Sequence, residues 1–370
     1  MSSICFVSFY SGSLLFPGKQ GAVGGAEVQQ HFLAKALDEQ GVHVCYVIGD
    51  EPETKDLIHQ KFSVYRSYGR YSGRRFIKFI YPQFVKVWRA LRSADCDYYY
   101  VRGLRVDGGI TWLFCIFHRC KYIVAIASDR ECRANTITRS RWNPKRHLIL
   151  LGLKRANQVI AQTSWQRAQL RKEFGVNAKV IRNIMPADTR YMPLMGQPRN
   201  FLWVGTIVPN KRPEIYLDLA ERHPDLRFIM IGPARSGFEG YRANIKRQAS
   251  KISNLTYVDY VAPDEIHAFY RESDVVVLTS SYEGFSNVLL HAWSCGRPVV
   301  TSCDPDGVVA RYQLGYVTHQ DSDFERVLGE IGMMGSIPLL NDMGQRARSY
   351  IERFHTPTVI VREFYEALNI

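Results

Sequence analysis

Residues 274–300 read DVVVLTSSYEGFSNVLLHAWSCGRPVV. The apolar run that ends at Leu278 has the length and composition of a strand buried in a parallel sheet. A helix is expected to begin at Ser286 or Asn287, because both residue types are good N-caps, and a second apolar run follows that helix. The stretch therefore predicts a strand-helix-strand crossover, with residues 280–287 as the loop that leads into the helix.

The loop at 280–287 is the first candidate binding site. In open parallel sheets, ligands bind beyond the carboxyl ends of the strands. The loop carries a carboxylate, Glu283, beside Gly284, and the N-terminus of the following helix offers free N–H groups and a dipole that favours an anion. These features suit a ligand that is part hydroxyl-rich and part phosphate, such as a sugar nucleotide. An ordinary strand-loop-helix corner with a surface glutamate fits the spacing equally well.

The stretch from Glu283 onward resembles the signature of the retaining GT-B glycosyltransferases of family 4. That signature places two glutamates eight positions apart; Glu283 fills the first position, and His291 stands at the second. The resemblance implies that Glu283 holds hydroxyls of the donor sugar and that position 291 holds the ribose, where an imidazole bonds only one hydroxyl. The neighbours implied in donor binding are Gly284, Phe285, Ser286, Asn287 and His291.

A second motif lies at residues 201–213, which read FLWVGTIVPNKRP. It resembles the Gly-Arg…Lys motif of the same family. Lys211 matches the phosphate-binding lysine, whereas Thr206 stands where an arginine is usual. The resemblance makes Lys211 a catalytic candidate and Gly205, Thr206 and Arg212 donor-binding candidates; a plain surface lysine is the alternative.

The N-terminal part offers a glycine-rich loop and a polar turn. The loop between Gly12 and Gly25 runs from a buried strand into a helix, a suitable place for a phosphate, although a flexible loop fits as well. It lacks the GxGxxG pattern of dinucleotide sites. The Gly24–Gly25 pair resembles the family's glycine loop over the donor diphosphate. After the strand at 122–127, Ser128 or Asp129 could bind an acceptor hydroxyl, and Asp129 is the third catalytic candidate; a structural turn is equally compatible.

The length of 370 residues suits two domains. The resemblance implies an α/β protein of the GT-B class, with two Rossmann-like domains facing across a cleft. The acceptor domain would span 1–195 together with a final helix at 356–370, and the donor domain 198–355. No signal peptide is expected, and the longest apolar run, 110–117, is too short to span a bilayer.

The two halves of the chain differ in charge. Residues 1–200 hold 31 Lys and Arg against 14 Asp and Glu, a net charge of +17, whereas residues 201–370 hold 17 against 21, a net charge of −4. Basic residues alternate with aromatic ones over 66–92, and a further basic cluster follows at 130–146. These segments indicate an anionic membrane surface as partner; a solvated helix with an aromatic core face is the alternative. No nucleic-acid partner is expected, because no binding motif accompanies the charge.

The eight cysteines form no CxxC pair and no zinc spacing. They are expected to be reduced core residues, and no metal site and no cofactor are expected.

The resemblance implies retaining transfer of a sugar from a nucleotide-sugar, with UDP-sugar favoured and GDP-sugar possible, to a saccharide or lipid-linked saccharide. The transfer would be a step of polysaccharide or glycolipid synthesis, with the acceptor located at the inner face of the cytoplasmic membrane. The reaction implied by the family needs no metal. Two alternatives stay open: a non-catalytic partner subunit that binds nucleotide-sugar weakly, and a non-hydrolysing UDP-sugar epimerase.

Overall fold

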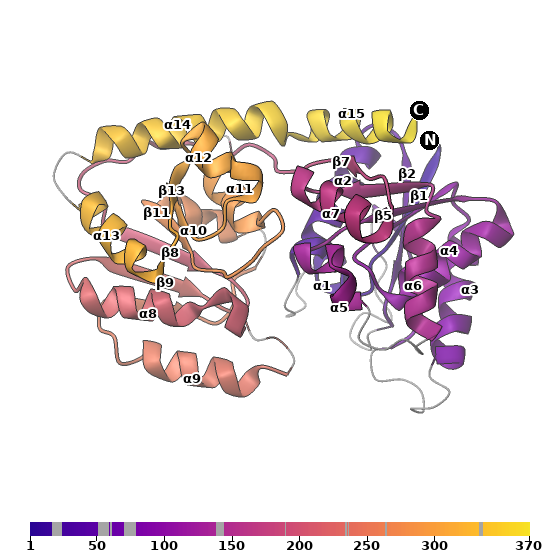
Figure 1. Cartoon of the computed structure of the whole chain (residues 1–370), viewed down its shortest axis with the longest axis horizontal. Coiled ribbons are helices and arrows are strands. Elements are labelled where there is room, and N and C mark those ends of the chain that lie inside the picture. The colour runs from indigo at the N-terminus through magenta and orange to yellow at the C-terminus, as the bar shows by residue number, and fades with distance from the viewer. Residues whose placement is uncertain are drawn as a thin grey trace. The chain divides into compact units, whose positions relative to one another are not determined.

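The computed structural model describes residues 1–16, 24–50, 59, 61–69, 79–137, 144–188, 190–233, 235, 237–262, 265–332 and 336–370. The chain divides into two compact units (Figure 1). Unit 1 consists of Met1–Ile184 together with Pro357–Ile370, and unit 2 consists of Met185–Thr356.

Unit 1 is built on a parallel sheet with the strand order β3-β2-β1-β4-β5-β6-β7. Its inner strands are short and largely apolar, as a sheet covered on both faces requires, whereas the two edge strands are partly exposed. The strands are β1 (Ser3–Val7), β2 (His43–Ile48), β3 (Ser63–Arg66), β4 (Tyr98–Arg102), β5 (Lys121–Ala125), β6 (Gln158–Ala161) and β7 (Lys179–Val180).

Helices cover both faces of this sheet, so unit 1 has two apolar clusters. The C-terminal helix belongs to the second cluster, where Ile360, Val361 and Phe364 are buried with Leu33 and Leu37. The helical elements are α1 (Gly12–Leu15), α2 (Gly25–Asp38), a π-turn at Phe79–Phe84, α3 (Val85–Ala94), α4 (Val106–His118), a 3₁₀ turn at Asp129–Cys132, α5 (Ala134–Ile137), α6 (Pro144–Lys154), α7 (Ser164–Phe174) and α15 (Pro357–Leu368).

Unit 2 is built on a second parallel sheet with the order β10-β9-β8-β11-β12-β13. Its strands are β8 (Asn200–Val204), β9 (Arg227–Ile231), β10 (Leu255–Val258), β11 (Val275–Leu278), β12 (Val299–Thr301) and β13 (Gly315–Val317). Its helices are α8 (Pro213–Arg222), α9 (Glu239–Ala249), α10 (Ile266–Glu272), α11 (Asn287–Ser294), α12 (Val308–Tyr312), α13 (Asp321–Gly332) and α14 (Ile337–Phe354), with 3₁₀ turns at Pro209–Lys211 and Pro305–Gly307.

Both sheets have the doubly wound order in which the direction of strand addition reverses once. The reversal lies between β1 and β4 in unit 1 and between β8 and β11 in unit 2. Ligands of such sheets bind beside the reversal, at the carboxyl ends of the two strands. The expected α/β class with two Rossmann-like domains is confirmed. Their cleft stays a prediction.

The segment after β7 belongs to unit 2, so the boundary lies at Ile184 rather than at the expected residue 195. Hydrogen bonds explain the difference: the Met185 N–H donates to the His355 carbonyl oxygen at 2.8 Å, and the Leu194 N–H donates to Asn341 Oδ1 at 2.7 Å. The proline and glycine content of this segment therefore marks a chain packed on unit 2 and not a free linker.

The close approach of α14 to the end of α11 predicts that a side chain at Gly344 destabilises unit 2. A Cβ built on Gly344 would lie 2.2 Å from the Gly296 carbonyl oxygen. We expect Gly344→Ala to lower the free energy of unfolding by about 1–3 kcal/mol, because one backbone must move. Gly329→Ala is the matched control: its Cβ would meet no atom within 4 Å, and it should raise stability by about 0.5–1 kcal/mol. Urea titration measures both, and equal stability of the two variants would contradict this packing.

Candidate active site

Two loops meet at the strand reversal of unit 2, one after β8 and one after β11. The buried Thr279 hydroxyl joins them: it accepts a hydrogen bond from Trp203 Nε1 at 3.0 Å and donates one to the Lys211 carbonyl oxygen at 2.6 Å. The Ser281 N–H donates to the Asn210 carbonyl oxygen at 2.8 Å. These bonds fix the backbone that carries both candidate charged residues.

Lys211 and Glu283, predicted from two separate motifs, form an ion pair at this junction. Lys211 Nζ donates to Glu283 Oε1, and Ser280 Oγ donates to the same oxygen at 2.6 Å. The lysine and glutamate side chains are 18% and 15% exposed, so both charges are partly withdrawn from water and interact more strongly than a surface pair. The site thus offers a cation for phosphate and a carboxylate for hydroxyls within one contact.

Arg212 holds the loop rather than presenting its charge. Its φ of +47° places it in the left-handed region, directly after the turn that carries Lys211. Its Nε donates to the Thr279 carbonyl oxygen at 2.7 Å, and its Nη1 donates to Asp321 Oδ1 at 2.7 Å. A polar cavity of about 280 Å³ lies beside it, lined by residues that follow β11, β12 and β13, including Ser280, Ser302 and Thr318.

The candidates at the start of α11 divide between the loop and the core. Gly284 and Asn287 are half-buried, and Ser286 is buried at the N-cap position. The Phe285 ring packs against Trp293 at 6.2 Å and His355 at 5.2 Å between ring centroids. The Phe285 side chain therefore serves packing, and only its backbone can face a ligand.

His291 lies one turn into α11 as a neutral, half-buried imidazole. Its ring stacks on Tyr270 at 5.3 Å and meets the edge of His267 at 4.8 Å. Burial, with a smaller contribution from His267, lowers the pKa of His291 to about 3, so the ring carries no charge at neutral pH. Among the described residues, its Nδ1 is a buried atom that meets no hydrogen-bond partner.

The remaining donor candidates in this unit are Gly205 and Thr206, both half-buried at the end of β8. The Gly205 N–H continues the sheet by donating to the Ile231 carbonyl oxygen at 3.0 Å. A Cβ on Gly205 would lie 3.1 Å from the Trp203 ring, so glycine relieves a tight contact there. The structure thus gathers the loop after β8, Lys211, Arg212 and Glu283 around one strand reversal.

The three candidates of unit 1 lie at the carboxyl edge of its own sheet. Gly24 and Gly25 are exposed at the start of α2; the part of their loop at 17–23 lies outside the described residues. Asp129 Oδ1 accepts a hydrogen bond from Gln166 Nε2 at 2.8 Å, and this contact fixes the carboxylate beyond β5. These residues belong to a separate unit from Lys211.

Sequence reasoning did not single out Arg105 and Glu131 beside the strand reversal of unit 1. The Arg105 guanidinium lies 4.5 Å from the centre of the Tyr10 ring. Burial opposes its charge, but Asp107 and Tyr10 outweigh this and raise the pKa of Arg105. The Glu131 carboxylate accepts the N–H groups of Leu104 and Ala127 at 3.1 and 2.8 Å. Their position just after β4 and β5, at the carboxyl edge of the sheet, could have identified them as site candidates from the sequence.

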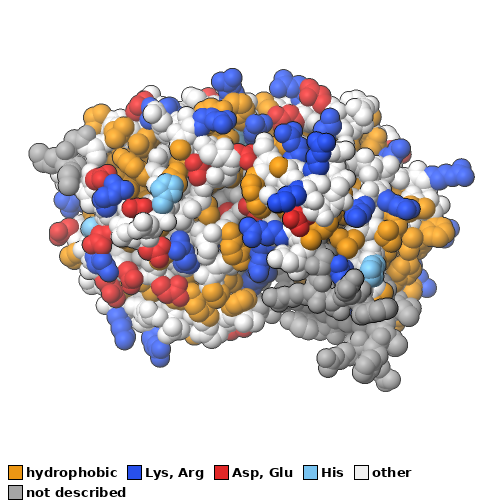
Figure 2. Space-filling model, in the orientation of Figure 1, with side chains coloured by type: hydrophobic (Ala, Val, Ile, Leu, Met, Phe, Trp, Pro, Cys, Tyr) orange, Lys and Arg blue, Asp and Glu red, His pale blue; other side chains and the backbone are white. Residues whose placement is uncertain are grey.

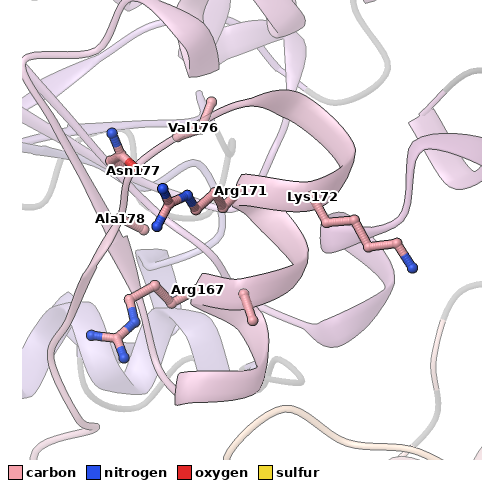
Figure 3. Close-up of a pocket in the computed structure, with 7 residues that line it drawn as sticks. Arg167, Arg171, Lys172, Val176, Asn177 and Ala178 are labelled. Carbon is pink, nitrogen blue, oxygen red and sulfur yellow. The ribbon is translucent and has the colours of Figure 1, made fainter.

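A cavity of about 580 Å³ lies against α7, at the opposite, amino edge of the sheet in unit 1. Figure 3 shows the side chains of Arg167 and Arg171 on the side of α7 that faces the segment with Asn177 and Ala178. The Lys172 side chain points to the opposite side of the helix. The cations of the last turn, Arg171 and Lys172, favour the negative end of the helix dipole. Ligands of such sheets bind at the carboxyl edge, so this cavity is not a candidate ligand site. We assign Arg171 and Lys172 the role of stabilising the helix end.

The ion pair makes a second prediction. We expect Lys211→Met to lower the free energy of unfolding by about 1–3 kcal/mol, because the partly buried Glu283 side chain loses its hydrogen-bonding cation. Adding Glu283→Gln should recover part of this loss. Arg222→Met, which breaks the exposed pair with Glu325, is the control and should cost less than about 1 kcal/mol. Strictly additive losses in denaturant titrations of the double variant would show that the pair does not interact.

Comparisons with known proteins match each unit to a glycosyltransferase model. The model described as Glycosyltransferase Family 4 matches residues 23–187, and the model described as Glycosyl transferases group 1 matches residues 198–326. D-inositol 3-phosphate glycosyltransferase of Rhodococcus jostii is 31% identical over 169 residues, which are 40% of this chain and 37% of that protein. Mannosylfructose-phosphate synthase of Agrobacterium fabrum is 26% identical over 177 residues, 41% of this chain and 39% of that protein. The matches thus span well under half the length of these relatives.

Solved structures with the same fold cover the whole chain. Sucrose-phosphate synthase from Thermosynechococcus elongatus has a TM-score of 0.79 at 16% identity and covers 99% of this chain and 98% of its own. Anabaena HepE in complex with UDP-glucose has a TM-score of 0.74 at 15% identity, covering 99% of both chains. With one matched domain in each unit and the GT-B fold throughout, the chain belongs to the glycosyltransferases of group 1 and family 4.

Proposed function

We propose that the chain is a retaining glycosyltransferase that moves a sugar from a nucleotide-sugar, with UDP-sugar favoured, to a saccharide or lipid-linked saccharide. The observation that carries the proposal is the ion pair of Lys211 and Glu283 at the strand reversal of unit 2. A donor of this class has a diphosphate that requires a cation and a sugar whose hydroxyls require an acceptor of hydrogen bonds.

In this proposal Lys211 leaves part of its contact with Glu283 and bonds the donor diphosphate. The ammonium then stabilises the negative charge that grows on the diphosphate as the bond to the sugar's anomeric carbon breaks. The N-terminus of α11, beside Ser286 and Asn287, adds its dipole to the same charge. Glu283, held by Ser280, accepts hydrogen bonds from hydroxyls of the sugar and so orients the anomeric carbon.

The acceptor hydroxyl forms the new bond on the face that the diphosphate leaves, so the anomeric configuration is retained. The departing diphosphate oxygen takes the acceptor proton, which balances the step without a protein base. Lys211 and the helix end supply the positive charge, and the proposed transfer therefore requires no metal ion. We assign the acceptor to unit 1, where Asp129 is fixed by Gln166.

UDP-sugar is favoured because structures of the same fold, such as Anabaena HepE, hold UDP-glucose. His291 limits the affinity in this proposal, since a neutral imidazole bonds one ribose hydroxyl where a carboxylate bonds two. Thr206 likewise supplies no cation to the diphosphate.

The test is turnover of UDP-, GDP- and ADP-sugars with a lipid extract as acceptor, followed by NMR of the product's anomeric proton. We expect one nucleotide-sugar to be consumed and the product to keep the donor's anomeric configuration. Lys211→Met should lower turnover by about 100-fold or more, whereas Arg222→Met should match the wild type. An inverted product would refute the mechanism; an epimer formed without acceptor would favour the epimerase.

We further propose that unit 1 binds the anionic inner face of the cytoplasmic membrane. In the described part of the chain, no helix is long and apolar enough to cross a membrane. The basic segments at 66–92 and 130–146 lie partly outside the described residues, at 70–78 and 138–143. Two helices that overlap their described parts, α3 and α6, both pack against α4.

These three helices expose apolar and cationic side chains together, as Figure 2 shows on the side where α3, α4 and α6 lie in Figure 1. Phe117 is 70% exposed, Ile116 54% and Leu151 42%. The cations exposed on these helices and at their ends are Arg89, Arg92, Arg119, Lys154 and Arg155. Exposed apolar groups and cations on neighbouring helices are what an anionic bilayer surface attracts.

Vesicle binding tests this surface. We expect the protein to sediment with phosphatidylglycerol-containing vesicles and Phe117→Ser to weaken that binding about tenfold, because a buried Phe contributes about 1.5–3 kcal/mol. Met195→Ser is the matched control, since Met195 is 89% exposed in unit 2 and should not affect binding. Equal binding of Phe117→Ser and wild type would remove this surface from the proposal.

A further inference from the structure

Three side chains that can ligate a metal converge beside His291 in unit 2, on the side where its ring contacts His267. Asp188 lies in the segment after β7, His267 in the first turn of α10, and Cys295 at the end of α11. Among the described residues, they form a group whose ligand atoms all lie within 4.8 Å of one another. The side chain of Asp188 is 8% exposed, that of His267 is 27% exposed, and Cys295 is buried.

The spacing of the three ligand atoms suits a tetrahedral ion. Cys295 Sγ lies 3.5 Å from Asp188 Oδ2 and 3.8 Å from His267 Nδ1, and His267 Nδ1 lies 4.0 Å from Asp188 Oδ2. Around a tetrahedral zinc ion, bond lengths of about 2.0–2.3 Å place neighbouring ligand atoms roughly 3.3–3.6 Å apart. Small movements of the His267 ring would therefore complete three corners and leave the fourth for water.

The protonation states of two of the residues already suit a metal. Burial lowers the pKa of His267 despite the opposing effect of Asp188, so its ring is neutral and can donate a lone pair. Burial would raise the pKa of Asp188, but the Arg190 N–H and Arg271 hold it below its usual value. Burial, together with Asp188, raises the pKa of Cys295 to about 12. The Cys295 proton is therefore the one that a bound ion must displace.

Arg348 Nη1 donates to the Asp188 backbone carbonyl oxygen at 2.7 Å, and the charge of Arg190 helps to lower the pKa of His267. The cation in contact with the Asp188 carboxylate is Arg271. Its Nη1 donates to Asp188 Oδ2 at 2.8 Å, the same oxygen that faces the other two ligands. A carboxylate oxygen has two lone pairs, so one can accept from Arg271 while the other binds an ion. Asp188 Oδ1 accepts the Arg190 N–H at 2.8 Å. Such outer hydrogen bonds orient a ligating carboxylate.

We propose that Asp188, His267 and Cys295 bind a zinc ion that ties the segment after β7 to α10 and α11. Thiolate, imidazole and carboxylate are the ligand types that zinc prefers together. The ion has a structural role and takes no part in the proposed sugar transfer, so the two proposals stand separately. By fixing the His267 ring, it would also fix the face of His291 that the same ring contacts.

Cobalt substitution tests the site without any nucleotide. The full chain is dialysed against a chelator and titrated with Co²⁺. We expect one equivalent to produce a thiolate-to-cobalt charge-transfer band and the visible bands of tetrahedral cobalt, and Zn²⁺ to displace both. Cys295→Ala should abolish the charge-transfer band, and His267→Gln and Asp188→Asn should each weaken Co²⁺ binding at least tenfold. Cys303→Ala is the matched control, because Cys303 is the other cysteine of unit 2, and it should keep the spectrum.

Each variant is checked by circular dichroism, and His267→Gln, which leaves the Arg271–Asp188 pair intact, covers a failure of the others to fold. No charge-transfer band at stoichiometric Co²⁺ would overturn the proposal and leave the cluster as an ion pair with a neighbouring thiol. A band that survives in Cys295→Ala, or one that disappears in Cys303→Ala, would also overturn it.

Discussion

The candidate site depends on one constraint: β8 and β11 are neighbours, although seventy residues separate them in the sequence. Their adjacency brings the loop of Lys211 against the loop of Glu283. The buried Thr279 hydroxyl, bonded to Trp203 on one side and to the Lys211 backbone on the other, makes the two loops one rigid object. The charged pair is then held at the one edge of the sheet where the free ends of strands and helices can receive an anion.

The paired charges also explain how the site remains stable without a ligand. A half-buried carboxylate beside Ser280 alone would be costly, and a half-buried ammonium would be equally so. Together they offset each other's loss of hydration, and each keeps bonding capacity for a donor. A ligand with a diphosphate and hydroxyls satisfies both groups at once, which is why the pair fits a nucleotide-sugar better than a simple anion.

The fold could be predicted from the sequence because apolar strands and capped helices alternate in short, regular units. The predicted residues Lys211 and Glu283 meet because both follow strands at the carboxyl edge. Local pattern could not show that Phe285 packs on His355, or that Arg212 is engaged by Asp321, because both depend on residues distant in sequence. The boundary at Ile184 was missed for the same reason, since hydrogen bonds to Asn341 and His355 hold the following segment.

The Asp188–His267–Cys295 group illustrates the limit of spacing rules most clearly. Its members lie in three segments with no recognisable metal-ligand spacing, and the sequence therefore predicted no metal. Only the packing of α10 and α11 around the segment after β7 brings them within reach of one ion. Similarly, the exposed Phe117 and Ile116 read as part of an ordinary apolar helix until the structure places them at its uncovered end.

The most direct measurement of the central claim is calorimetric titration of the protein with UDP-sugars. The account predicts that one of them binds and that Lys211→Met weakens its binding at least tenfold, since a charge-assisted contact contributes about 1.5–3 kcal/mol. Arg222→Met should bind that sugar nucleotide as the wild type does. Unchanged affinity in Lys211→Met would contradict the account, because the donor would then bind without the ion pair at the strand reversal.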